Sequence, residues 1–421
     1  MNATQTPLGR FLPRHTQNAI EEALEDTRVV LIVGARQCGK STLVRQVTSG
    51  QDAILRNLDQ ATVRQAAEFD PETFVRESGM LVIDEIQRVP ELLLAIKSVV
   101  DEDQHPGQFL LTGSARLLGM RGVPDLLPGR VETIELWPLS QGEIDGSGDG
   151  FIDAIFEFGP EFRHRSTEDR HGYIDRVIRG GFPEAVARQG RRREAFFDNY
   201  VSDIINRDVI QLSEIERGPQ MRTLVRLLAA RAGGLLVPGS LTGDLGLTRP
   251  TIDRYLGLLE EVFLIKRVPA WSRNLSSRAI STPKVCFVDS GIAANLLGQD
   301  IRGLARPDSP FGGILESFVS MELARQLTWS QTRAEMFHYR TKDKVKVDIV
   351  LEDRRGRVVA FDVKASSTVR PDDFRGINHL ATRLGDDLVV GVVLYTGTET
   401  LAFGPKNIAV PIAALWESGA Q

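Results

Sequence analysis

The chain has 421 residues, of which 42% are apolar and 25% are charged, and its formal net charge is −5. These values are ordinary for a globular protein, and at roughly 100–200 residues per domain the length predicts two to four domains. The two cysteines, Cys38 and Cys286, exclude a disulfide framework and a cysteine-based metal site. We expect no signal peptide, no membrane partner and a cytoplasmic location, because no apolar run is long enough for a leader or a membrane span.

Short apolar runs alternate with helical stretches between residues 28 and 139. The runs at 28–33, 80–83 and 108–112 predict buried strands, and the stretches at 40–47, 60–69 and 91–101 have helical periodicity. Buried strands that alternate with helices predict an α/β fold whose parallel sheet is covered on both faces. The turn-rich sequence DGSGDG at 145–150 is typical of a domain end.

The sequence GARQCGKST after the first strand fits the pattern G-x-x-x-x-G-K-[ST], with Gly34, Gly39, Lys40 and Ser41 at the fixed positions. Glycines let successive N–H groups converge on phosphate oxygens, and the following helix adds its positive N-terminal end. Lys40 would reach the outer phosphates, and Ser41 would offer its hydroxyl to Mg²⁺. ATP and Mg²⁺ are therefore the predicted cofactors. We expect the nucleotide to contact Gly34, Ala35, Arg36, Gln37, Cys38, Gly39, Lys40, Ser41 and Thr42.

A second motif, MLVIDE at 80–85, ends a buried strand with two carboxylates. Asp84, at the tip of the strand, can hold Mg²⁺ together with Ser41. Glu85, one residue further, can polarise the attacking water as a general base. The alternative is a pair of acids that only ends a strand at the surface, and the neighbouring phosphate loop argues against it. Lys40 and Glu85 are therefore the predicted catalytic residues of this part of the chain.

The third strand ends in TGSAR, which brings Thr112 and Ser114 to the same edge of the sheet. Either side chain can sense the terminal phosphate, or both can be ordinary turn residues; we include Ser114 and Asp84 among the nucleotide contacts. Arg116 and Arg130 are candidates for stabilising charge in the transition state, within the chain or across subunits of an oligomer. The Cys38 thiol, inside the loop, is expected to be a small filler rather than a redox switch.

The region 151–235 is expected to be mostly helical, with amphipathic runs at 195–212 and 221–232. Residues 240–268 have the helix, turn, helix and strand order of a winged helix, with Gly246 at the turn, Thr248 as a cap and a wing strand at 263–268. Residues 269–310 are expected to be irregular. The apolar face of the two helices consists of Leu241, Leu245, Leu247, Ile252, Leu256 and Leu259.

Positive charge is concentrated in the same region. Residues 222–280 hold nine basic and four acidic side chains, a net charge of +5 in a chain whose total is −5. The second helix of a winged helix can enter a DNA major groove while basic side chains contact phosphates, so DNA or RNA is a predicted partner. The alternative is a winged helix that serves as a lid or spacer, since Glu260 and Glu261 crowd the end of its second helix.

The last part of the chain predicts the αβββαβ order of the restriction-endonuclease core. Its expected elements are a helix at 313–327, strands at 335–340, 345–351 and 357–363, a helix near 373–384, and a strand at 388–395.

Four residues of this part fall where nuclease chemistry would need them. Glu316 lies on the leading helix, Asp348 in the second strand, and Asp362 and Lys364 at the end of the third. Asp348 and Asp362 can hold Mg²⁺ near a scissile phosphate while Lys364 stabilises the developing charge, so these three are predicted catalytic residues. The alternative is a nuclease-like fold that only binds or scaffolds.

The chain resembles the prokaryotic AAA-type ATPases that pair such a loop with a C-terminal domain of unknown function. The resemblance covers nearly the whole chain and rests on GARQCGKST, MLVIDEIQRVPEL, FLLTGSAR, LPGRV, LWPLSQGE, GGFPEA, INRDV and KVCFVDSGIAANLLG. It implies a nucleotide-binding first domain, a helical and winged-helix middle, and a nuclease-like end. One position departs from the usual nuclease pattern: Asp362 stands where glutamate is common, which keeps the carboxylate and shortens its reach.

These observations predict four parts: an AAA-type ATP-binding domain at 1–148, a helical lid or linker at 149–238, a winged helix at 239–285, and a restriction-endonuclease-like domain at 286–421. The leading hypothesis is an ATP-hydrolysing switch or motor that acts on nucleic acid. The second is a regulatory NTPase with a protein partner and no nuclease activity. A third is a toxin-like or defence nuclease gated by ATP.

Overall fold

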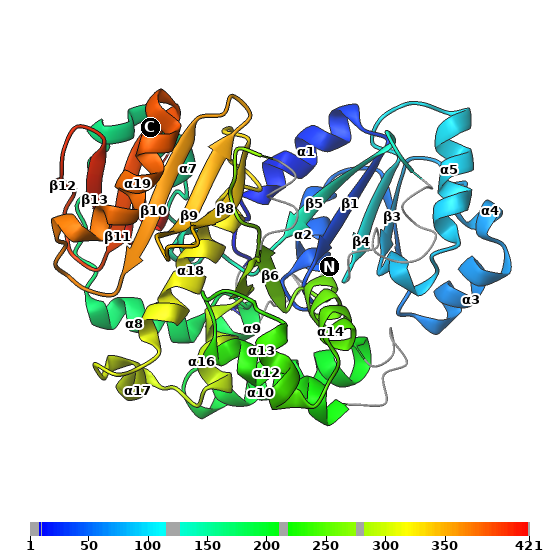
Figure 1. Cartoon of the computed structure of the whole chain (residues 1–421). Helices are drawn as coiled ribbons and strands as arrows, with labels where there is room; N and C mark the ends of the chain where they lie inside the picture. Colours follow the sequence, from blue (N-terminus) through cyan, green and yellow to red (C-terminus); the bar gives the residue numbers. More distant parts are fainter. Residues whose placement is uncertain (1–7, 10, 115–126, 210–217, 275–281, 420–421) are drawn as a thin grey trace. The chain divides into compact units, whose positions relative to one another are not determined.

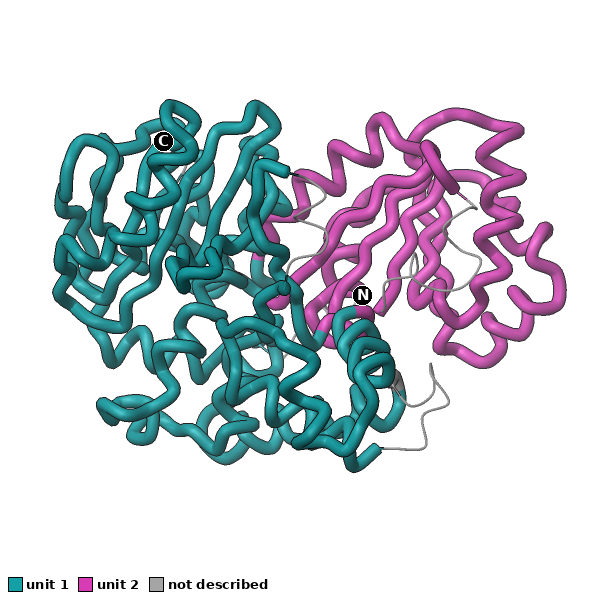
Figure 2. Tube along the Cα trace, viewed as in Figure 1, with its two compact units in different colours: residues 1–12, 139–260, 264–421 teal, residues 13–138, 261–263 magenta. Residues whose placement is uncertain are grey.

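The computed structural model describes residues 8–9, 11–114, 127–209, 218–274 and 282–419. The chain divides into two compact units, which Figure 2 shows in two colours. Unit 2 contains residues 13–138 and 261–263, and unit 1 contains residues 1–12, 139–260 and 264–421. The finer, four-part division expected from the sequence stays a prediction.

Unit 2 is built on a five-stranded sheet in the order β2-β3-β4-β1-β5, in which all paired neighbours are parallel (Figure 1). Every residue of the central strands β1 and β4 is buried, which is why both are almost wholly apolar. Because the strands are parallel, their carboxyl ends share one edge of the sheet. The strands are β1 (Val29–Gly34), β2 (Ala53–Asn57), β3 (Met80–Asp84), β4 (Phe109–Gly113) and β5 (Val131–Leu136).

Helices connect these strands, and the predicted parallel α/β core is confirmed. The helix α5 shows why: its buried face is aliphatic, whereas Leu94 on the other face is 59% exposed. The edge strands β2 and β5 were not expected, because an edge strand buries less of its surface and so lacks a continuous apolar run. The helices are α1 (Thr16–Asp26), α2 (Lys40–Val47), α3 (Ala61–Phe69), α4 (Pro71–Phe74), η1 (Ile86–Arg88) and α5 (Leu92–Glu102).

Unit 1 begins with helices, as expected for this region. They are α6 (Gln141–Asp145), α7 (Phe151–Phe158), η3 (Gly159–Glu161), α8 (Arg170–Arg179), α9 (Pro183–Val186), α10 (Arg191–Asp203), the π-helical η4 (Ile204–Val209) and α12 (Gly218–Ala230).

Two further helices and an antiparallel strand pair follow. The helices are α13 (Gly239–Leu245) and α14 (Arg249–Glu261), and Gly246, with φ of 61°, ends the first of them. The strands β6 (Ile265–Val268) and β7 (Lys284–Phe287) pair with each other. The expectation that 269–310 is irregular is wrong, because this range contains β7, α16 (Ser290–Leu296) and α17 (Ile301–Ala305). These three elements were not predicted because they are short and are surrounded by glycine, serine and arginine residues.

The last part of unit 1 is a six-stranded mixed sheet in the order β12-β13-β11-β10-β9-β8. The strands β8, β9 and β10 form an antiparallel meander, and β11 joins β10 in parallel after the helix α19. The pair β12 and β13 extends the sheet beyond the expected elements. The bounds are α18 (Phe311–Gln326), β8 (Ala334–Arg340), β9 (Lys346–Asp353), β10 (Val358–Lys364), η5 (Pro371–Phe374), α19 (Arg375–Leu384), η6 (Gly385–Asp387), β11 (Leu388–Tyr395), β12 (Leu401–Ala402), β13 (Asn407–Pro411) and α20 (Ala414–Glu417).

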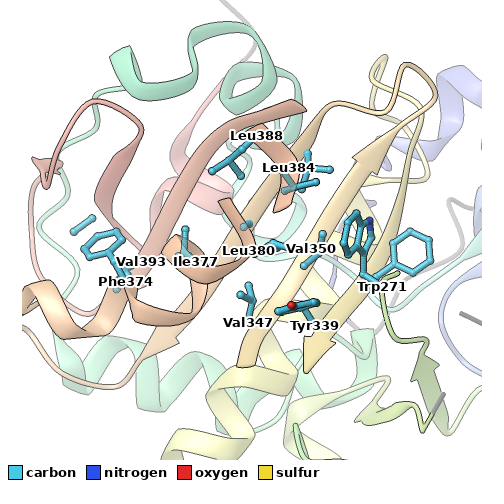
Figure 3. Packing of buried hydrophobic residues seen from close by; sticks show 14 of the residues in the cluster. Trp271, Tyr339, Val347, Val350, Phe374, Ile377, Leu380, Leu384, Leu388 and Val393 are labelled. Carbon is cyan, nitrogen blue, oxygen red and sulfur yellow. The ribbon is translucent and has the colours of Figure 1, made fainter. Parts of the chain in front are cut away.

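A core of apolar side chains lies between α19 and this sheet (Figure 3). Ile377 and Leu380 of α19 are fully buried against strands that include Val350 and Val393. Such burial is worth about 1.5–3 kcal/mol for each large aliphatic side chain. No helix in the described part of the chain combines the length and hydropathy that a membrane span requires.

Candidate functional site

The loop between β1 and α2 depends on two glycines of the predicted phosphate motif. A Cβ on Gly34 would lie 2.1 Å from the backbone oxygen of Leu136 on β5, closer than any real contact. Gly39 has φ of 106°, which L side chains rarely adopt, and it directly precedes α2. Both positions therefore require glycine for backbone reasons.

The Lys40 ammonium contacts the backbone of the phosphate loop. The Lys40 Nζ donates to the carbonyls of Gly34 at 2.9 Å and Ala35 at 3.0 Å, and the side chain is buried. The remaining expected contacts Arg36, Gln37 and Thr42 lie in the same loop or on the first turn of α2. A cationic group therefore lies at the N-terminal end of a helix, where anions are favoured.

Ser41 and Asp84 meet across the sheet edge, although 43 positions separate them. The Ser41 hydroxyl donates to Asp84 at 2.9 Å, and the Asn57 amide donates to the same carboxylate at 3.3 Å. Thr112 also donates to Asp84. A hydroxyl beside a carboxylate is a pair of hard oxygen donors, which is the chemistry that Mg²⁺ prefers. This donor set therefore fits the predicted magnesium ion.

Glu85 follows Asp84 in a left-handed conformation, with φ of 64°. Its backbone N–H donates to the Thr112 hydroxyl at 3.1 Å, which helps to hold that conformation. The Gln87 side-chain amide donates to the Glu85 carboxylate and, at 2.8 Å, to Ser114 Oγ. The tips of β3 and β4 are thus joined in one hydrogen-bond network. No role was predicted for either Asn57 or Gln87: Asn57 lies outside the motifs, and Gln87 lies within MLVIDEIQRVPEL but has no part in the carboxylate pair at its centre.

Arg14 is a third contributor that the sequence did not indicate. Its buried guanidinium donates to the backbone oxygens of Cys38 at 2.9 Å and Trp137 at 2.7 Å, which ties the loop to the segment after β5. The Cys38 thiol is fully buried and lies 3.4 Å from the Leu136 oxygen, as a filler residue would.

Arg116 and Arg130 were the two arginines predicted as candidates for stabilising charge in the transition state. Arg130 contacts Asp101 at the end of α5, so its guanidinium forms an ion pair within unit 2. Arg116 lies outside the described residues.

A second group of charged side chains gathers in unit 1, and it contains the residues predicted for nuclease chemistry. Asp348 on β9 and Asp362 on β10 share a side-chain hydrogen bond, and the Val363 N–H donates to Asp348 Oδ2 at 3.1 Å. Glu316 on α18 joins them through Lys284, whose ammonium contacts Glu316 and lies 3.3 Å from Asp348 Oδ1. We call Lys284, Glu316, Lys346, Asp348 and Asp362 the terminal cluster.

Lysines surround the carboxylates of the terminal cluster. Lys346 Nζ lies 2.9 Å from Asp348 Oδ1, whereas Lys364 lies 3.4 Å from Asp373. Lys284 was missed by the sequence analysis, because it lies in the region expected to be irregular. Only the packing of β7 against α18 brings it to Glu316.

Burial and the neighbouring charges shift the pKa values of the three carboxyl groups of the terminal cluster in different directions. Burial, together with the Asp348 charge, raises the pKa of Glu316 to about 7. Burial and the same charge raise the pKa of Asp362 well above its usual value. Although burial opposes it, the ammonium groups of Lys284 and Lys346 lower the pKa of Asp348. The Asp348 carboxyl therefore loses its proton more readily than the Asp362 carboxyl to which it is hydrogen-bonded.

The carboxylates of the terminal cluster are already paired with lysines and with one another, which bears on whether the cluster could hold a divalent cation. An ammonium already bridges Glu316 and Asp348, and the third carboxylate, Asp362, is hydrogen-bonded to Asp348. Across the described residues, no group of three or more His, Cys, Asp or Glu side chains has an arrangement that could hold a metal ion. In this arrangement the terminal cluster does not fit an additional Mg²⁺, and the predicted metal role of Asp348 and Asp362 stays a prediction.

The basic residues of the 222–280 region are partly neutralised by neighbouring acids. Arg231 pairs with Asp244 at 3.3 Å and Arg249 with Asp253 at 3.7 Å. Arg267 pairs with Glu260, whose oxygen also accepts the Arg267 N–H. The acidic end of α14 is thus used in part to hold the β6–β7 pair. Other exposed basic residues on α12 and α14 are Arg222, Arg226 and Arg254.

Two of the motifs that carried the family resemblance have a structural explanation. The fully buried Asp289, from the VDSG segment, accepts N–H bonds from Gly181 at 2.6 Å, Gly291 at 2.8 Å and Ile292 at 3.3 Å. A Cβ on Gly180, from the GGFPEA segment, would lie 2.2 Å from the Asp289 carboxylate. These motifs connect α8 to the start of α16, so they determine packing.

Three family models match separate parts of the chain. Residues 26–145 match the family model described as an AAA domain. Residues 170–302 and 311–415 match two domains of unknown function, DUF8612 and DUF4143.

Curated relatives of similar length are described only as uncharacterized proteins. One, from Mycobacterium tuberculosis, is 28% identical over 406 residues, which cover 95% of this chain and 83% of that protein. Another, from Haemophilus influenzae, is 21% identical over 337 residues, which cover 74% and 78%. The solved structure of a Walker-type ATPase of Pyrococcus abyssi is 16% identical, with a TM-score of 0.43, and the match covers 70% of this chain and 99% of that one.

The parallel sheet, the glycine-dependent loop at its edge and the match of residues 26–145 agree with one another. Residues 26–145 are therefore similar to an AAA domain and have its parallel α/β sheet with a glycine-dependent loop at the sheet edge.

Proposed function

We propose that the chain binds ATP with Mg²⁺ and hydrolyses it in unit 2. The observation that carries this proposal is the hydrogen bond from Ser41 to Asp84, which brings the two expected magnesium-binding side chains together beside the phosphate loop. Residues 34–42 would hold the phosphates. Bound Mg²⁺ would neutralise charge on the β- and γ-phosphate oxygens.

The chain's own groups have distinct roles in this proposal. The Lys40 ammonium exchanges the carbonyls of Gly34 and Ala35 for phosphate oxygens when ATP binds. Glu85 orients and polarises the attacking water, and the Gln87 amide holds its carboxylate toward the sheet edge. Ser114, at the tip of β4, contacts the terminal phosphate. Hydrolysis would therefore be sensed at the tips of both β3 and β4.

We propose nucleic acid as the partner on which this ATPase acts. The succession of α13, α14 and the β6–β7 pair supports a winged helix, and the net +5 of residues 222–280 supports contact with phosphates. The ion pairs at Arg231, Arg249 and Arg267 reduce the charge that is available for this role. Binding is therefore expected to be modest and strongly dependent on salt.

The order of α18, the β8–β10 meander, α19 and β11 supports a restriction-endonuclease-like architecture for the last part of unit 1. We propose that this part engages its partner without cleaving it, since Lys284 bridges Glu316 and Asp348 and Lys364 pairs with Asp373. Mg²⁺-dependent cleavage of DNA or RNA that disappears in Asp348→Ala would instead establish the nuclease alternative.

The partner is tested by measuring the ATPase activity of the full chain with and without DNA and RNA, and its binding to each polymer with and without ATP, at low and high salt. Stimulation by one polymer, weakened by salt, identifies the partner class. Absence of binding to either polymer, with or without ATP, rejects the nucleic-acid proposal and favours a protein partner. In that case Lys40→Ala abolishes function in cells, and Lys364→Ala leaves it intact.

A further inference from the structure

Lys284 lies at the first position of β7, and its exposed fraction is only 6%. Its ammonium contacts the Glu316 carboxylate, lies 3.3 Å from Asp348 Oδ1 and donates to the Asp348 backbone oxygen at 3.1 Å. Lysine is rarely buried in this way unless its charge is paired. Three oxygen atoms, from one helix and one strand, therefore surround this ammonium.

The backbone that carries Lys284 is fixed on several sides. β7 pairs with β6, and on its other edge Gly233 N–H donates to the Val285 oxygen at 3.0 Å. The Phe287 N–H donates to Ser317 Oγ on α18 at 3.1 Å. Because Glu316 directly precedes Ser317, this bond sets the register between the lysine and its carboxylate. The position of the Lys284 ammonium is therefore set by β7, a hydrogen-bonded strand that packs on α18.

The remaining charges of the terminal cluster also disfavour the binding of a divalent metal ion. Lys346 lies 2.9 Å from the same Asp348 oxygen that faces Lys284, and the other Asp348 oxygen accepts the Val363 N–H. A divalent ion such as Mg²⁺ needs several free oxygen donors at about 2.0–2.1 Å. It would also meet two ammonium groups at short range, in a buried site where charge repulsion is weakly screened.

We propose that the Lys284 ammonium is the resident cation of the terminal cluster, and that it takes the place between Glu316 and Asp348 that a divalent metal ion would need. The terminal cluster then needs no metal ion, because the ammonium of Lys284 on β7 is its cation. Removing that cation creates a metal site from the carboxylates that remain. This inference does not depend on ATP hydrolysis in unit 2.

The test measures Mn²⁺ binding to the nucleotide-free full chain by calorimetry and electron paramagnetic resonance. Lys284→Met keeps the length of the side chain and removes its charge. We expect it to gain one Mn²⁺ site whose affinity exceeds that of the wild type by about tenfold or more. The gain is lost when Asp348→Asn is added. Equal Mn²⁺ affinity in the wild type and Lys284→Met overturns the proposal.

Lys346→Met is the matched control, because it removes a lysine from the same carboxylate but leaves Lys284 in place. We expect its gain in Mn²⁺ affinity to be smaller than that of Lys284→Met. A gain as large as that of Lys284→Met would show that any loss of positive charge opens the site. That result would contradict the proposal that Lys284 in particular takes the place of a metal ion between Glu316 and Asp348.

The wild type supplies a measurement that does not depend on the folding of a variant. Acylation of lysines, followed by mass spectrometry, reports whether Lys284 stays protected when Mn²⁺ is added at millimolar concentration. The proposal predicts equal protection with and without Mn²⁺. Exposure of Lys284 on addition of Mn²⁺ would show that metal displaces the ammonium and would overturn the proposal.

Discussion

The side-chain amide of Gln87 donates a hydrogen bond to the carboxylate of Glu85. The same nitrogen donates to Ser114 Oγ at 2.8 Å. The proposed general base is therefore held by a residue that also contacts the tip of the neighbouring strand. A side chain with two such contacts can align Glu85 with the position of the terminal phosphate.

Gln87→Ala is expected to lower kcat for ATP by about tenfold to a hundredfold, because a misplaced base loses much of its effect. KM should change little, since the phosphate loop is untouched. Steady-state kinetics of the full chain measure both values. Gln51→Ala is the matched control, because its amide bonds the Val47 oxygen away from this network. An unchanged kcat in Gln87→Ala would remove Gln87 from the catalytic arrangement.

Lys40→Ala is expected to weaken ATP binding by about a hundredfold, because two charge-assisted contacts to phosphate are lost. Equilibrium binding of a fluorescent ATP analogue measures the change. Lys97→Ala, on α5 of the same unit, should bind the analogue as the wild type does. Comparable affinity in Lys40→Ala and the wild type would contradict the assignment of the phosphate loop.

Asp289→Ala is expected to reduce the free energy of unfolding by about 3–5 kcal/mol, because it leaves three buried N–H groups without their acceptor. Chemical denaturation measures the loss. The control Asp198→Ala removes an exposed contact to Asn295 and should cost about 0.5 kcal/mol or less. Similar losses in the two variants would mean that Asp289 does not organise the contact between α8 and α16.

His338 makes the stability of unit 1 depend on pH. Burial first, and then the Lys284 and Arg340 charges, lower the pKa of His338 to about 4, although the bond to the Thr282 oxygen opposes this. An unfolded histidine has a pKa of about 6.5, so the unfolded chain binds the proton more readily. The stabilising contribution is complete above about pH 6.5 and is lost as the pH falls toward 4.

Denaturation curves of the wild type and His338→Gln test this expectation. The difference in unfolding free energy should shift against the wild type by up to about 3 kcal/mol between pH 7 and 4.5. His171→Gln, an exposed histidine on α8, provides the comparison. A difference between the wild type and His338→Gln that stays constant over this pH range would disprove the effect.

The core of unit 2 could be predicted because its determinants are local in sequence. β1, β3 and β4 are continuous apolar runs, and the phosphate loop is one uninterrupted motif. The edge strands β2 and β5 escaped notice, because their residues are only partly buried and their composition is mixed.

Contacts between distant segments could not be predicted in the same way. The role of Lys284 depends on β7 lying against α18, 32 positions from Glu316, and no local pattern encodes that distance. Arg14 reaches Trp137 across 123 positions for the same reason. The convergence of Asp348 and Asp362 was foreseen, because a short hairpin joins their strands. The position of Lys284 beside them was not foreseen.

Unit 2 is proposed to hydrolyse ATP with Glu85 as the general base. The most direct test is a single-turnover comparison of the wild type and Glu85→Gln, with ATP affinity measured alongside. Glu85→Gln is expected to bind MgATP as tightly as the wild type and to hydrolyse it at least about a hundredfold more slowly. Equal hydrolysis rates in the two proteins would contradict the proposal.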